Sequence, residues 1–167
     1  YMQNTDDVIN GYLVKLSENT GDLIWARSYP SEIKNKESAI EAVIRSADNA
    51  ILVAGVINAD KGTLEGFKSY GNPVSGDAFV TYFSEKQIAS EIAPEAPIWE
   101  LKIKNALAVK HLEELPSGGG FLLAAHGDEE PMIAKVIKIS VDGRPMWELD
   151  VPNHGELTAI TVTEKGY

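Results

Sequence analysis

The chain of 167 residues contains no cysteine. This absence excludes a disulfide framework, zinc or iron–sulfur sites with cysteine ligands, and thiol catalysis. No apolar run approaches the roughly 20 residues that a membrane-spanning helix needs, so no membrane insertion is expected. The sequence also lacks an Asn-X-Ser/Thr acceptor, and nothing therefore indicates N-glycosylation.

Basic residues are few and scattered along the chain. There are 25 acidic side chains against 15 basic ones, which gives a formal net charge of -10. Binding to a phosphate backbone needs clustered Lys and Arg, so nucleic acid is not expected as a partner. The hydrophobic fraction of 44% is sufficient for a sizeable core.

One pattern occurs three times: an alternating strand that ends in serine, a turn or insertion, and a second strand with a tryptophan. The copies are residues 14–17 with Trp25, residues 80–84 with Trp99, and residues 137–140 with Trp147. These are the only three tryptophans of the chain. A repeat of this kind predicts a stack of β-sheet units.

Each tryptophan is followed by a further alternating segment, and in the first two copies an apolar run that ends in small residues comes next. These segments are 39–44 and 50–55 in the first copy, 107–109 and 121–125 in the second, and 157–162 in the third. The sequence therefore predicts an all-β fold with units of four antiparallel strands. The expected units are 11–58, 77–126 and 131–167, with insertions at 60–76 and 85–97, and the chain is expected to be a piece of a longer protein.

Two segments have helical spacing. Residues 37–45 carry apolar side chains at helical intervals, but their place in the repeat favours a strand. Residues 85–92 are predicted to form a short helix inside the second insertion, before Pro94.

Several residues fit packing roles in such a fold. Gly21 and Gly143 suit turns that need a positive φ angle. The tryptophans are expected to lie between adjacent sheets. The pairs Ala54-Gly55 and Ala124-Ala125 suit positions where neighbouring backbones approach closely.

This succession of strands and turns resembles the repeat of secreted bacterial and algal β-propeller proteins, most closely at residues 138–147. The Thr20-Gly21 pair ahead of Trp25 is also similar to the pyrroloquinoline-quinone repeat of quinoprotein propellers. The resemblance implies two and a half to three blades of a larger propeller and a secreted or extracytoplasmic location. It implies no catalytic residue.

The three histidines, His111, His126 and His154, are candidate metal ligands or acid–base groups. His126 and His154 stand in matching phrases, but they follow and precede different strands of the repeat. They are therefore expected on opposite rims, as polar loop residues rather than as a shared site.

Two acidic stretches contain the oxygen ligands that calcium prefers. They are residues 128–130 and the set Asn4, Asp6, Asp7 and Asn10. Neither keeps the spacing of a calcium-binding loop, so solvated loops are the favoured interpretation. The apolar residues 132–137 suggest either a partner surface or, more simply, a buried inner strand.

These observations favour a non-catalytic module that contacts a protein partner or the subunits of an assembly. Long insertions in a repeat usually map to a binding face. The predicted contact residues lie in the first insertion: Phe67, Tyr70, Asn72 and Val74. No catalytic, cofactor or metal residue is assigned. The alternative is part of a quinoprotein oxidoreductase that binds pyrroloquinoline quinone and calcium.

Overall fold

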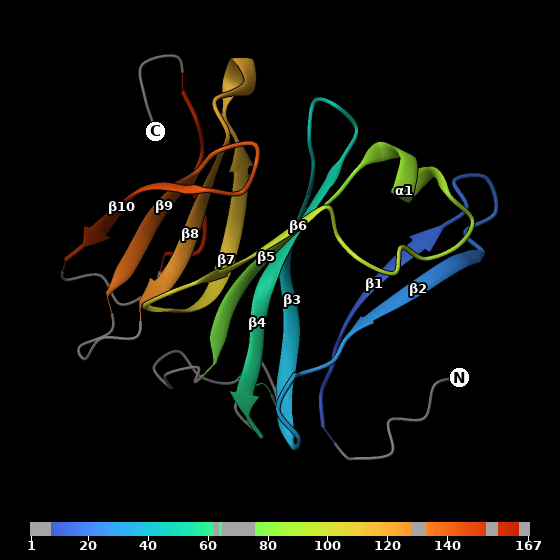
Figure 1. The fold of residues 1–167 in the computed structure, drawn as a ribbon, viewed down its shortest axis with the longest axis horizontal. Coiled ribbons are helices and arrows are strands. Elements are labelled where there is room, and N and C mark those ends of the chain that lie inside the picture. Colours follow the sequence, from blue (N-terminus) through green and yellow to red (C-terminus); the bar gives the residue numbers. More distant parts are fainter. Residues whose placement is uncertain (1–7, 62–63, 65–75, 128–132, 153–156, 164–167) are drawn as a thin grey trace.

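The computed structural model describes residues 8–61, 64, 76–127, 133–152 and 157–163, and within them the chain is all-β (Figure 1). The strands are β1 Gly11–Leu16, β2 Leu23–Tyr29, β3 Lys36–Arg45, β4 Ile51–Asp60, β5 Asp77–Phe83, β6 Trp99–Ile103, β7 Ala106–Glu114, β8 Phe121–Gly127, β9 Ala134–Ile139 and β10 Pro145–Val151. A short helix, α1 Glu85–Ala89, and a 3₁₀ turn, Pro116–Gly118, complete the described elements.

The described strands form three antiparallel sheets. Their orders are β1-β2, β3-β4-β5-β6 and β7-β8-β9-β10, so each strand pairs with its neighbour in the chain. The sheets stand as three layers with β3–β6 in the middle (Figure 1). None of them closes on itself in the part of the chain that the structure describes.

The four-stranded sheets are offset by two strands from the expected units 11–58, 77–126 and 131–167. Each sheet joins the last two strands of one unit to the first two of the next. The chain passes to the next sheet after β2 and after β6. Pro30 follows β2 and has no N–H to continue a ladder, and the short connection after β6 includes Asn105 at φ 58°.

The strand expected at residues 157–162 is not present. These residues have no regular structure, and only Thr163 makes an isolated bridge. A strand needs a neighbour that completes its hydrogen-bond ladder, and no described strand pairs with this segment.

Two other expectations are confirmed. The segment with helical spacing is the strand β3, and the helix in the second insertion is α1, which ends earlier than residue 92. A capping box starts α1, because the Ser84 hydroxyl accepts from Gln87 N and the Gln87 side chain accepts from Ser84 N.

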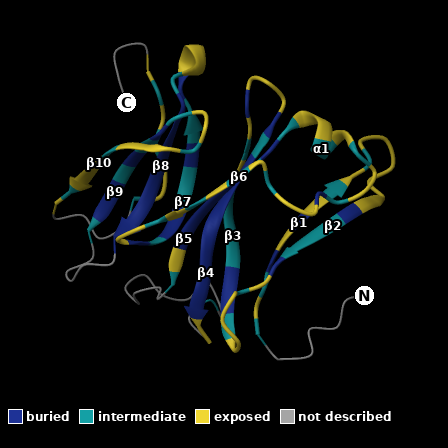
Figure 2. Ribbon diagram, in the orientation of Figure 1, coloured by how far each residue is buried: buried dark blue, intermediate teal, exposed yellow. Residues whose placement is uncertain are grey.

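The middle sheet is buried on both faces. Leu52 and Ala54 of β4 pack with residues of the β7–β10 sheet, whereas Val53 and Ile57 pack with β1 and β2. Successive side chains of a strand point to opposite faces, so one strand contributes to two cores. Figure 2 shows that β4 and β8 are buried along most of their length.

Gly55 lies where β3 and β4 approach most closely. A Cβ atom placed on Gly55 would lie 2.0 Å from the carbonyl oxygen of Ala39. The small-residue prediction is therefore confirmed at this position, and the backbone of β3 leaves no space for a side chain.

We expect Gly55→Ala to lower the free energy of unfolding by about 3 kcal/mol, the upper end of the usual overpacking range. The reverse change at the matching position of β8, Ala125→Gly, should lower the free energy of unfolding by only about 1 kcal/mol. Urea denaturation of both variants measures the difference. Equal losses would show that β3 can move away from Gly55.

Candidate functional site

A tryptophan connects each pair of adjacent sheets. The indole N–H of Trp25 on β2 donates to the carbonyl oxygen of Ser90 at 3.2 Å, and that of Trp99 on β6 donates to the carbonyl oxygen of Val141 at 3.2 Å. Ser90 lies in the β5–β6 connection and Val141 in the β9–β10 connection, so the acceptors hold corresponding places. We call each such contact region a seam, and the positions of Trp25 and Trp99 between sheets confirm the prediction for these two residues.

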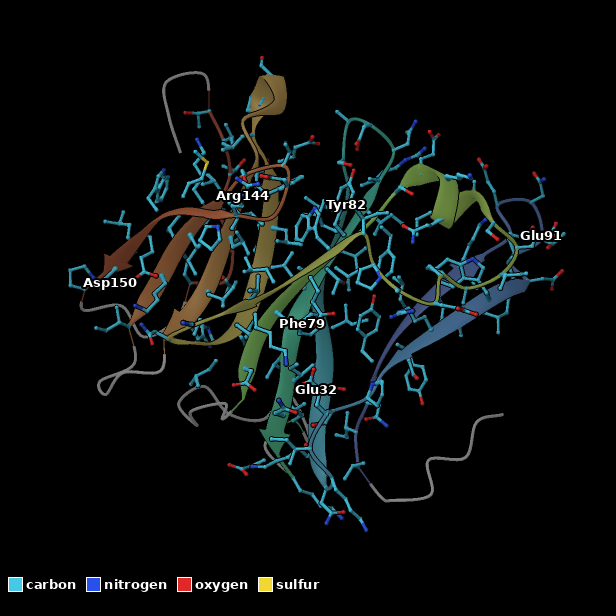
Figure 3. All side chains as sticks on the ribbon, viewed as in Figure 1. Glu32, Phe79, Tyr82, Glu91, Arg144 and Asp150 are labelled. Carbon is cyan, nitrogen blue, oxygen red and sulfur yellow. The ribbon has the colours of Figure 1, made fainter. Side chains whose placement is uncertain are left out.

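At the second seam the indole of Trp99 is held from two sides. The Tyr82 ring stacks on it with centroids 5.3 Å apart and an interplanar angle of 6°. On the β9–β10 side, a Cβ placed on Gly143 would lie 2.7 Å from Trp99 Cδ2. Gly143 has φ 77°, so it meets both a conformational and a packing demand. Tyr82 and Arg144, which follows Gly143, are labelled in Figure 3.

The serine that ends each repeated strand organises the connection that follows. The hydroxyls of Ser17 and Ser140 accept backbone N–H groups within hairpin turns, whereas the hydroxyl of Ser84 caps α1. The same position thus begins either a tight turn or a helix. Because Ser84 caps a helix instead of closing a tight turn, the insertion 85–97 can follow β5 while β5 and β6 still pair as neighbours.

Lys15 ties β1 to the second insertion. Its ammonium group donates to the carbonyl oxygens of Ile88, Ala89 and Ser90 at 2.8, 3.3 and 3.2 Å. These carbonyls end α1, where intrahelical partners are lacking. The insertion is therefore part of the first seam, next to the bond from Trp25.

The β3–β4 loop is bonded to β5 and to the next sheet. Tyr82 Oη donates to Asp48 Oδ2 at 2.8 Å, and Ala47 N donates to Glu114 Oε2 at 2.8 Å. Hydrogen bonds from the hydroxyls of Ser46 and Tyr82 lower the pKa of Asp48. Burial, with the hydrogen bond to Asp48 as a further cause, raises the pKa of Tyr82 to about 12.

An ion pair links the first strands of the two four-stranded sheets. Lys110 Nζ on β7 lies 2.9 Å from Glu41 Oε1 on β3, and the two side chains are 18% and 22% exposed. Because the pair is partly buried, salt screens it less than it screens a surface ion pair. The ion pair therefore favours one alignment of β3 with β7.

Most residues that the sequence singled out lie outside the described residues. These are Phe67, Tyr70, Asn72, Val74, His154, residues 128–130, Asn4, Asp6 and Asp7. Asn10 is described and lies directly before β1. The structure therefore does not place the expected contact residues relative to one another.

The two described histidines lie in different settings. His111 Nε2 on β7 is 3.8 Å from Glu113 Oε2, and both side chains are 35% exposed. His126 was expected in a loop, but it lies within β8 and is 4% exposed. The prediction was wrong because β8 continues past Ala125, where His126 pairs with Ala134 of β9.

Two shallow hollows border the middle sheet among the residues that the structure describes. One of about 140 Å³ is lined by residues that include Arg27, Tyr29, Phe79 and Glu100, and another of about 280 Å³ borders the β6–β7 connection. Both are below the roughly 300 to 1,000 Å³ of typical ligand pockets. The Arg27 guanidinium carbon lies 5.3 Å from the centroid of the Tyr29 ring, so this cation is already packed on an aromatic ring.

Within the described ranges, no group of three or more His, Asp or Glu side chains is arranged to hold a metal ion. The polar groups described above instead bond across strands and seams. Among the same residues, no helix has the length and apolar character needed to cross a membrane.

Two apolar faces at the ends of the stack were missed by the sequence reasoning. The β1–β2 outer face includes Tyr12, Val14, Leu16, Ile24 and Ala26, together with Ser28, which pairs with Tyr12. The β9–β10 outer face consists of Val136, Lys138, Trp147, Leu149 and Val151. Residues 12, 13, 14 and 16 of β1 are all apolar, and a strand that is apolar on both faces indicates burial on both faces. That signal could have identified the first face.

Comparison with known proteins gave no assignment: the sequence matches no family model and no curated protein.

We expect Gly143→Ala to destabilise the protein more than Gly21→Ala. Both glycines have φ near the left-handed region, 77° and 74°, but a Cβ on Gly21 would meet no atom within 4 Å. Gly21→Ala should cost only the conformational penalty of about 1–2 kcal/mol, whereas Gly143→Ala must also displace the Trp99 indole. Chemical denaturation measures both variants.

The excess cost of Gly143→Ala should shrink in a Trp99→Leu background, which makes the pair a double-mutant cycle. If the excess is unchanged there, contact with the indole is not its cause.

Tyr82 should make stability sensitive to alkaline pH. Its folded-state pKa of about 12 lies above the ordinary value of 10.0, so the unfolded chain loses this proton first. The stabilising contribution is complete below pH 10 and is lost as the pH rises from about 10 to 12. Tyr82→Phe keeps the stacked ring and should flatten this decline in urea midpoint, whereas Tyr12→Phe, at an exposed ring, should leave the decline as it is in the wild type. An equally steep decline in Tyr82→Phe would contradict the assignment.

Proposed function

We propose that the chain is a non-catalytic repeat module, a section of a β-propeller-like stack, that acts in protein–protein contact or assembly. The observation that carries this proposal is the repeated seam. Trp25 and Trp99 make the same indole-to-carbonyl bond to corresponding connections of the next sheet. A bond that recurs in this way fits blades that follow one another by one constant relation.

The form of the sheets supports the same proposal. Each four-stranded sheet is a meander of consecutive strands, and the tryptophan stands on its last strand. The first strands, β3 and β7, lie close enough for the Lys110–Glu41 ion pair. In a propeller the first strand of each blade lies nearest the central axis.

The use of polar groups favours a non-catalytic role. Lys15 and Glu114 bond to backbone groups, and Asp48 accepts from neighbouring hydroxyls within its own sheet. The Gly-X-X-X-Trp spacing of Gly21 and Trp25 recurs at Gly143 and Trp147. At Gly143 this spacing has a packing explanation, because Gly143 contacts Trp99 of the preceding sheet. No described observation favours the quinoprotein alternative.

The partner contacts are proposed on the insertion between β4 and β5, at Phe67, Tyr70, Asn72 and Val74. β4 ends at Asp60 and β5 begins at Asp77, so the insertion leaves and rejoins the middle sheet at one end. Long insertions in repeat proteins usually lie on one binding face.

Quantitative affinity capture from the native source tests this function. The double variant Phe67→Ala/Tyr70→Ala should capture at least about tenfold less of a bound protein than the wild type, because aromatic residues often supply most of the binding energy of an interface. Ile92→Ala is the matched control, since Ile92 is 76% exposed in the other insertion. The protein retained by the control should then bind the purified chain directly. Equal capture by both variants would remove the first insertion as the contact site.

A further inference from the structure

The hollow of about 140 Å³ at the first seam carries charges of both signs. Strand β2 and the connection after it line one side, and β4, β5 and β6 line the other. Tyr29 and Phe79 supply apolar lining, and their stacked rings have centroids 5.7 Å apart. The charges belong to Arg27, Glu32 and Glu100. Phe79 and Glu32 are labelled in Figure 3.

Arg27 is held in place but not neutralised. Its Nη1 donates to the carbonyl oxygen of Pro94, and its guanidinium carbon lies 5.3 Å from the ring centroids of Tyr29 and Phe83. Among the described residues, Nε is buried without an acceptor and the guanidinium forms no ion pair. Because a partly buried cation without an anion is unfavourable, the hollow lacks a negative group at Arg27.

Glu100 is the unpaired anion of the same hollow. Within the described ranges, its carboxylate takes part in no hydrogen bond or ion pair, whereas Glu32 is already paired with Lys102. Burial raises the pKa of Tyr29, and of the charges near its hydroxyl Arg27 opposes this rise whereas Glu100 adds to it. The two unpaired charges therefore act on one ring of the hollow without pairing with each other.

Volume and charge together define the ligand that fits. An engineered apolar cavity of about 150 Å³ binds benzene, so this hollow has room for about six heavy atoms. A simple anion would be attracted by Arg27 and repelled by Glu100, and a simple cation would experience the reverse. A zwitterion instead satisfies both residues through charge-assisted hydrogen bonds.

We propose that this hollow binds a small free α-amino acid, of the size of alanine, with its carboxylate on Arg27 and its ammonium group on Glu100. The short side chain of the ligand then packs against Tyr29 and Phe79. The bound molecule connects β2 to β6 and thus the first sheet to the middle sheet. This site goes beyond the proposed function, because the residues that carry it lie outside the insertion 60–76.

Titration of the ¹⁵N-labelled 167-residue chain with L-alanine, followed by NMR, tests the site. The signals of Arg27 Nε–H and of the Glu100 backbone amide should shift and saturate, with a dissociation constant on the order of 1 mM. Propionate and ethylammonium each lack one of the two charges of alanine. Both should bind at least about tenfold more weakly than L-alanine.

Glu100→Gln gives the decisive comparison, because it removes the negative charge at an exposed position with little change in volume. This variant should bind L-alanine at least about tenfold more weakly and propionate more tightly, since the repulsion of the carboxylate is lost. Glu148→Gln removes an exposed carboxylate of β10 and should bind both compounds as the wild type does.

Arg27→Gln should bind neither L-alanine nor propionate, and thermal unfolding followed by circular dichroism checks that this variant is folded. The reversal of preference in Glu100→Gln tests the site without depending on it.

If L-alanine causes no saturable shift at about a hundredfold excess over the expected dissociation constant, the hollow holds only water and the proposal is overturned. Equal affinities for L-alanine and propionate in the wild type also overturn it, as do unchanged affinities in Glu100→Gln. If the site fails these tests but Phe67→Ala/Tyr70→Ala still loses a captured protein, this inference is wrong while the proposed function stands.

Discussion

The rest of the structure depends on the bond between a tryptophan indole N–H and a backbone carbonyl of the next sheet. Sheet-on-sheet packing by aliphatic side chains alone is non-directional and allows neighbouring sheets to slide. The bonds from Trp25 and Trp99 each anchor one sheet to a defined connection of its neighbour. They therefore convert hydrophobic contact into a fixed alignment, and the stacked Tyr82 ring and Gly143 complete that alignment at the second seam.

The seams also explain how the repeat tolerates insertion. The connection after β5 is much longer than the turns after β1 and β9, yet it still brings a carbonyl, that of Ser90, to the tryptophan of the preceding sheet. The Ser84 cap and the Lys15 contacts hold this longer connection in place. The alignment of the sheets is thus conserved within the chain although the connecting segments differ.

Because the polar side chains of the described residues mostly tie strands, loops and sheets together, the surfaces of the stack are where a function can reside. The middle sheet is covered on both faces, whereas β1 exposes Tyr12, Val14 and Leu16 and β10 exposes Leu149. Exposed apolar patches on an otherwise acidic chain are typical of contact sites.

Local features of the fold were accessible from the sequence. The place of residues 37–45 in the repeat predicted β3 correctly against its helical spacing, the insertion before Pro94 was predicted to contain the helix found as α1, and glycine marked the turn at Gly143. Four features could not be predicted from the sequence: the pairing of strands from two different expected units in one sheet, the absence of a strand at residues 157–162, the burial of His126 and the exposure of Val14. Alternation and turn residues determine local backbone angles and the two faces of a strand, which is why the strands themselves could be predicted. Which strand completes a ladder, and which face meets another sheet, depends on hydrogen bonds and contacts between residues far apart in the chain, so only the tertiary structure decided them.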